Sequence, residues 1–316
     1  MKANFPGYYR PTDGEFETLW KEAIFIFDAN VLLNIYGYSK PTRNILVSIL
    51  NVASVRSWIP HQFALEYQRN RAKAILEQVA NYVSVKKELE KIILDSFKSR
   101  RKHPHVTRKS VAAVENVCVE LGKGEKEHLK LLQSDPYFDC ISSCFEGRTG
   151  SPYNSQELQK IWNEGRTRFS TEVPPGFADA KKPEPDCYGD LVGWFQILDK
   201  AKDGSAPVIF VTDDRKKDWW QITSTDRTIG PRPELVEEFI RVTGKKFYMY
   251  QLDQFMALAK NFFGQSVTSE ALAEVRELRE SSVAIKSAPK AVPYLLEARG
   301  EEKTSAVDDD KKSEVS

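Results

Sequence analysis

AIFIFDANVLLN, residues 23–34, decides the fold of this chain. Its unbroken apolar run, 23–27, is strand-sized and typical of a strand buried on both faces of a parallel sheet. Residues 207–212, PVIFVT, repeat the pattern and are followed by Asp213 and Asp214. Because Asp28 also follows its strand directly, the two stretches predict a parallel sheet with carboxylates at one edge.

Strand and helix patterns alternate along the rest of the chain. We expect two further strands, at 54–59 and 246–250. Apolar residues at helical spacing predict the helices, which cover about 41–50, 62–99, 108–132, 156–168, 191–198, 234–242 and 252–263. This order predicts an α/β fold with a mainly parallel sheet over 1–265, elaborated by a helical insertion at 67–175. Residues 266–316 are interpreted as a helical extension and a solvated tail.

Composition narrows the class of protein. The chain has 316 residues, of which 41% are hydrophobic and 29% charged, an ordinary globular balance. No apolar run approaches the ~18–20 residues that span a bilayer, and the N-terminus lacks the apolar region of a secretory signal. The four cysteines form no CxxC pair, which favours a reducing cytoplasm. Membrane, collagen-like, secreted disulfide-rich and fully disordered classes are excluded.

Four acids arrive near strand ends from separate parts of the chain. Asp28 and Asp214 follow apolar strands, Glu66 lies early in the next helix, and Asp190 lies early in the helix around 191–198. Like charges gathered at one sheet edge oppose ionisation unless a divalent cation offsets them. Any one of these aspartates is explained equally well as a helix cap or turn residue. The pair Asp28 and Asp214 favours a metal site, and the histidine-poor set suits Mg²⁺ or Mn²⁺ better than Zn²⁺.

Other chemistries lack their motifs. The chain has no GxGxxG, GxxxxGK[ST] or GxSxG sequence, which argues against a dinucleotide enzyme, a P-loop NTPase and an α/β-hydrolase. A phosphatase of the haloacid-dehalogenase type needs D-x-D after its first strand, whereas residue 30 is asparagine.

The acidic motifs resemble those of one nuclease family. DANVLLN, 28–34, is similar to the opening D-x-N-x-L-L motif of PIN domains, and VTDD, 211–214, is similar to their closing V-T-x-D motif. Glu66 and Asp190 match the second and third acids of the family. The resemblance covers about 5–260 and is greater to the larger bacterial PIN-like proteins than to the compact toxins.

This resemblance implies a Rossmann-like α/β/α sandwich and a metal-dependent nuclease, most often a ribonuclease. Asp28, Glu66, Asp190 and Asp214 would be catalytic and would bind Mg²⁺ or Mn²⁺, with Asp213 as a further metal ligand. Asn30 and Thr212 would orient the acids. A nucleic-acid-binding or regulatory module with little or no catalysis is the alternative. Asp179 and Asp186 receive no role from the motif.

Basic residues indicate where RNA or single-stranded DNA would bind. The stretch 67–175 holds 19 Lys and Arg against 14 Asp and Glu, a net charge of +5, although the whole chain carries only +1. Its segment 98–109 has six basic residues and no acid, and it supplies the candidates Arg100, Arg101 and Lys102. Arg215, Lys216 and Lys217 follow the Asp pair and are further candidates. Solubility and local charge balance explain both groups equally simply. A homodimer and an inhibitory partner stay open.

Overall fold

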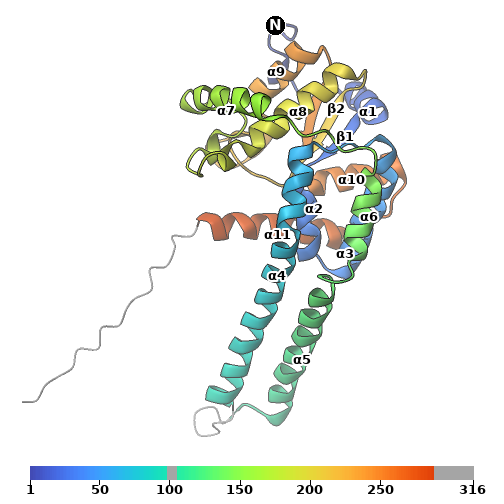
Figure 1. The fold of residues 1–316 in the computed structure, drawn as a ribbon. Coiled ribbons are helices and arrows are strands. Elements are labelled where there is room, and N and C mark those ends of the chain that lie inside the picture. Colours follow the sequence, from blue (N-terminus) through green and yellow to red (C-terminus); the bar gives the residue numbers. More distant parts are fainter. Residues whose placement is uncertain (98–104, 288–316) are drawn as a thin grey trace, which may run out of the picture.

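The central sheet has three parallel strands. The computed structural model describes residues 1–97 and 105–287 (Figure 1). Strands β1 (Ile24–Phe27), β2 (Val208–Val211) and β5 (Phe247–Tyr250) lie in the order β1-β2-β5. In register, Phe27 pairs with Val211, and Val211 pairs with Tyr250. All three strands therefore end at the same edge, and the predicted α/β fold with a parallel sheet is confirmed.

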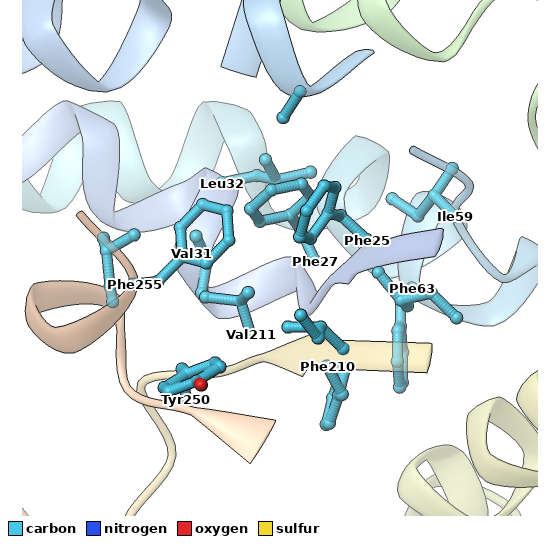
Figure 2. Close-up of a cluster of buried hydrophobic side chains, with 14 of the residues drawn as sticks. Phe25, Phe27, Val31, Leu32, Ile59, Phe63, Phe210, Val211, Tyr250 and Phe255 are labelled. Carbon is cyan, nitrogen blue, oxygen red and sulfur yellow. The ribbon is translucent and has the colours of Figure 1, made fainter. Parts of the chain in front are cut away.

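Apolar side chains on both faces of this sheet explain why its strands are unbroken hydrophobic runs. Phe25, Phe27 and Phe210 are fully buried. Figure 2 shows these strand residues packed against side chains of neighbouring helices, among them Phe63 and Phe255. The Phe63 and Phe210 rings stack with their centroids 5.7 Å apart. Each such ring contributes about 1.5–3 kcal/mol by leaving water, which holds the strand ends in place.

Helices surround the sheet and supply most of the chain. Their bounds are α1 (Asp13–Glu22), α2 (Ala29–Leu33), α3 (Lys40–Ala53), α4 (His61–Ile92), α5 (Arg108–Lys130), α6 (Pro136–Phe145), α7 (Ser155–Ser170), α8 (Gly189–Asp203), α9 (Pro233–Thr243), α10 (Leu252–Phe263) and α11 (Ser269–Ser287). The predicted helix over 252–263 matches α10 at both ends. None of the described helices is both long and apolar enough to cross a bilayer.

Helices α4 and α5 lie side by side and extend far from the sheet (Figure 1). Most of α4 and all of α5, α6 and α7 fall in the stretch 67–175, the predicted helical insertion. A buried polar group secures α4 near the sheet. Asp135, which caps α6, accepts hydrogen bonds from Tyr36 Oη at 2.6 Å and from Arg71 Nη1 at 2.7 Å. Because Asp135 is almost fully buried, this pairing ties α4 to both η2 (Asn34–Gly37) and α6.

The prediction of a strand over 54–59 is wrong. Helix α3 continues to Ala53, and a 3₁₀ turn (Ser54–Arg56) occupies the first half of the predicted strand. Only two isolated parallel bridges remain, one from Ser57 to Phe25 and one from Ile59 to Thr149. The extended stretch is too short to form a ladder because Pro60 ends it and α4 starts at His61.

Three further elements were not expected from the sequence, namely α1, α6 and the antiparallel hairpin of β3 (Trp220–Ile222) and β4 (Thr228–Pro231). Helix α1 starts at a capping box formed by Thr12 and Glu15, a signal that the sequence did contain. Strands β3 and β4 are short and partly exposed, so their apolar alternation was weak.

Candidate active site

One cavity of about 1210 Å³ at the carboxyl edge of the sheet is lined by seven carboxylates, those of Asp28, Glu66, Asp179, Asp186, Asp190, Asp213 and Asp214. Asp28 and Asp214 lie in the turns after β1 and β2, and the backbone N–H of Asp28 donates to Val211 O at 2.9 Å. Glu66 comes from the second turn of α4, and Asp190 from the first turn of α8. Asp179 comes from the 3₁₀ turn η5 (Phe177–Asp179). The structure thus brings all four matched acids to one cavity and adds Asp179.

Asn30 and Thr212 connect the two strand ends. Thr212 Oγ1 donates to Asp28 Oδ2 at 2.7 Å, and Asn30 Nδ2 donates to the same oxygen at 2.6 Å. Asn30 Oδ1 accepts from the backbone N–H of Asp213, and Thr212 Oγ1 accepts from that of Asp214. These four bonds fix how the Asp28 carboxylate lies relative to the turn after β2.

The surroundings of Asp28 and Glu66 disfavour the charged forms of their carboxyl groups. Burial, then the neighbouring charges of Glu66 and Asp190, raises the pKa of Asp28 well above its usual range. Burial and the Asp190 charge likewise raise the pKa of Glu66, although Lys216 opposes the shift. No described Lys or Arg forms an ion pair with either carboxylate. This side of the cavity is therefore short of positive charge.

The ammonium group of Lys216 lies among the other three acids. Its Nζ is 2.8 Å from Asp179 Oδ2, 2.9 Å from Asp190 Oδ2 and 2.8 Å from Asp214 Oδ2. Burial lowers the pKa of Lys216, but the charges of Asp190, Asp214 and Asp179 outweigh it and raise that pKa. The ammonium predicted to meet nucleic acid thus points into the acidic cavity.

A buried aspartate positions Asp179. Asp218 Oδ2 accepts from the backbone N–H groups of Gly176 at 2.8 Å and Ala178 at 3.0 Å. Gly176 has φ 100°, which an L side chain adopts only with strain. Burial raises the pKa of Asp218 to about 6, with the Asp190 charge as a second cause. The available signal for this loop is GFAD, residues 176–179, and a glycine three residues before an aspartate is too common to be decisive.

Asp213 has different surroundings from Asp214. It is buried and accepts hydrogen bonds from the Leu252 backbone N–H at 3.1 Å and from Asn34 Nδ2 at 3.3 Å. Arg279 Nη1 of α11 lies 3.5 Å from Asp213 Oδ1. Burial nevertheless raises the pKa of Asp213, although Arg279 acts to lower it. The Asp213 carboxylate is thus engaged by α10, α11 and η2.

Of the remaining predicted nucleic-acid contacts, Arg215 lines the same cavity and Lys217 does not. Arg215 pairs with Asp226 at 3.2 Å, and exposed Lys217 lies 3.7 Å from Glu172. The predicted contacts Arg100, Arg101 and Lys102 lie outside the described residues. Trp219 and Trp220 are buried in the hydrophobic core.

The tertiary structure adds cavity residues that the sequence did not indicate. Arg69 and Asn70 of α4, Trp162 of α7 and Lys182 after η5 line the same space, and exposed Asp186 lies there too. No local motif marks these positions, because they approach the acids only through folding.

The donor chemistry fits a divalent cation in part. Carboxylate oxygens are the hard ligands that Mg²⁺ and Mn²⁺ prefer. Within the described ranges, no three His, Cys, Asp or Glu side chains converge closely enough, as they stand, to hold a metal ion. Asp28 and Glu66 have no cationic partner among the described residues, whereas the other acids hold the ammonium group of Lys216. Both observations indicate that the cavity favours cations.

Comparison with known proteins agrees with this geometry. Residues 24–235 match the family described as PIN like domain, and the chain belongs to that family. The match includes every acid of the cavity and Lys216 but excludes α10 and α11. No curated protein and no solved structure matches the chain. PIN-like domains form a superfamily of nucleases, which gives the class of protein to which the acidic cavity belongs.

Proposed function

We propose that this protein is a metal-dependent nuclease that hydrolyses the phosphodiester bonds of RNA. The observation that carries the proposal is the convergence of Asp28, Glu66, Asp190 and Asp214 on one cavity at the carboxyl edge of the sheet. In open α/β sheets this edge is where ligands bind. Membership of the PIN-like family supports the same chemistry.

The four acids would hold Mg²⁺ or Mn²⁺ through their carboxylate oxygens. A divalent ion in such a site activates a water molecule and offsets the charge that develops on the phosphate. Asn30 and Thr212 keep the Asp28 carboxylate oriented by their hydrogen bonds to Oδ2. The ligand set leaves out Asp213, because its carboxylate is engaged by Arg279 and Leu252.

Side chains at the cavity rim suit a single nucleic-acid strand. Arg69 and Lys182 are exposed cations that would neutralise phosphates. Trp162 offers an aromatic surface on which an unpaired base would stack. We place the protein in the cytoplasm because all four cysteines are free.

The test compares cleavage by the wild type and by Asp28→Asn. End-labelled single-stranded RNA, single-stranded DNA and duplex DNA are incubated with Mg²⁺, with Mn²⁺ or with EDTA. We expect cleavage of RNA by the wild type with metal only. Asp28→Asn should lower the rate by more than about 100-fold, because losing a ligand exceeds the 10–100-fold cost of losing a residue that only orients one.

Asp139→Asn is the matched control, because Asp139 is exposed on α6 away from the cavity. It should cleave at the wild-type rate. Equal cleavage by the wild type and Asp28→Asn would reject the site. A wild type that binds RNA but never cleaves it would favour a nucleic-acid-binding module without catalysis. The position of the Lys216 ammonium among the acids is compatible with that alternative.

A further inference from the structure

The Lys216 ammonium donates hydrogen bonds to Asp179 and Asp190 and forms an ion pair with Asp214 inside the acidic cavity. An ammonium group has three N–H donors. Three carboxylates lie within 2.9 Å of Lys216 Nζ, and they come from η5, α8 and the turn after β2. The ammonium therefore holds together three elements that are distant in the sequence.

The backbone around Lys216 is fixed as well. Its N–H donates to Asp214 Oδ1 at 3.1 Å, and its carbonyl oxygen accepts from the N–H groups of Trp219 and Trp220. Trp219 Nε1 also donates to Asp190 Oδ2 at 3.3 Å. The buried Trp219 and Trp220 rings anchor this turn in the core. The backbone of this turn therefore positions the Lys216 ammonium group among the acids.

The cavity consequently has two unequal sides. On one side, Asp179, Asp190 and Asp214 already contact a cation. On the other, Asp28 and Glu66 form no ion pair with any described Lys or Arg. Two-metal nuclease sites place their ions about 3.5–4 Å apart and share carboxylates between them. A second ion in this cavity would need the Oδ2 atoms of Asp190 and Asp214, which Lys216 Nζ already contacts.

We propose that Lys216 takes the place of a second metal ion, so that the site binds one divalent cation beside Asp28 and Glu66. This inference rests on the proposed nuclease function. Lys216 then neutralises the acids permanently and sets the number of metal ions that bind, and it does not bind the phosphates of the nucleic acid.

The test counts Mn²⁺ ions bound by the metal-free full-length chain, using calorimetry and the electron paramagnetic resonance signal of free Mn²⁺. The wild type should bind one ion per chain. Lys216→Met removes the ammonium and keeps the length of the side chain, so it should bind two. Lys217→Met is the matched control, because the Lys217 side chain is 63% exposed and its only ion pair among the described residues is with exposed Glu172. It should bind one ion.

Two ions on the wild type would overturn the inference, as would one ion on Lys216→Met with unchanged affinity. If Lys216→Met does not fold, a second measurement on the wild type accompanies the count of bound ions. Nuclear magnetic resonance records the ¹⁵N-labelled lysine side chains, and Lys216→Arg identifies the signal of Lys216. The Lys216 ammonium signal should persist when Mg²⁺ is added. Its loss on adding Mg²⁺ would mean that metal displaces the lysine, which contradicts the inference.

The two proposals fail in different ways. Two ions together with Asp28-dependent cleavage would overturn the counter-ion role and leave the nuclease intact. No metal binding by the wild type, together with no cleavage, would overturn both.

Discussion

The hydroxyl of Thr212 joins the two acidic strand ends. It donates to Asp28 Oδ2 and accepts from Asn30 Nδ2 at 3.2 Å and from the Asp214 N–H at 3.0 Å. Thr212 is fully buried, so water cannot replace any of these bonds. One side chain therefore sets the distance and orientation between two proposed metal ligands.

Thr212→Val keeps the shape of the side chain and removes these hydrogen bonds. We expect Mn²⁺ affinity and RNA cleavage each to fall about 10–100-fold, the usual cost of losing a residue that orients a metal ligand. Calorimetry and a cleavage assay measure the two effects. Thr18→Val is the control, because Thr18 is exposed on α1 and its hydroxyl, within the described part of the chain, bonds only to Gly14 O. Unchanged affinity in Thr212→Val would show that Asp28 needs no such support.

At the scale of elements, the turn η5 depends on Asp218. The two backbone N–H bonds to Asp218 Oδ2 place Asp179 where it reaches Lys216 at 2.8 Å. The other oxygen, Oδ1, is buried and has no hydrogen-bond partner within the described residues. Because an unpaired buried carboxylate oxygen disfavours the charged form, the pKa of Asp218 rises to about 6.

This shift makes stability depend on pH. An acid whose folded pKa is raised stabilises the fold at low pH, and that stabilisation is lost as pH rises from the unfolded value of 3.8 through about 6. Two pKa units correspond to about 3 kcal/mol. The free energy of unfolding of the wild type, relative to Asp218→Asn, should fall by about this amount between about pH 4 and about pH 7.

Urea unfolding of both proteins in EDTA measures the difference. Asparagine can accept the same two N–H bonds and does not titrate, so Asp218→Asn should fold. A wild-type minus variant difference that stays constant over this pH range would show that Asp218 is ionised throughout.

At the scale of the whole molecule, α11 lies outside the family match yet contributes to the cavity wall. It packs on α10 and α3, and its Arg279 lines the cavity. Arg279 is buried and pairs with both Asp213 and Asp253. The extension thus neutralises two buried carboxylates beside the acidic edge of the sheet.

Arg279→Met should lower the free energy of unfolding by about 3–5 kcal/mol, because it leaves the buried Asp213 carboxylate without its ion-pair partner. Arg276→Met is the control on the same helix. Arg276 also pairs with Asp253, but its side chain is 56% exposed, so its loss should cost about 1 kcal/mol or less. Denaturant unfolding of the three proteins measures both. Equal losses for the two variants would mean that Arg279 acts as a surface residue.

The sequence predicted most of the fold because the deciding signals are local. Runs such as VIFV are apolar on both faces, and the helix over 252–263 has a clear apolar period, so neither needs tertiary contacts to be recognised. The strand predicted at 54–59 failed because α3 ran on to Ala53 and Pro60 ended the extended stretch, which left room for single bridges only.

Part of the candidate site was likewise predictable from local sequence signals, and part of it was not. The sequence by itself determined that Asp28 and Asp214 stand at strand ends, because the carboxyl ends of parallel strands meet at one edge. Only the tertiary structure decided that Lys216 turns inward to Asp179 and Asp190, that Asp213 pairs with Arg279, and that Trp162 reaches the cavity. The physical reason is that such pairings join residues distant in the sequence, and their charges and burial arise only once the chain has packed.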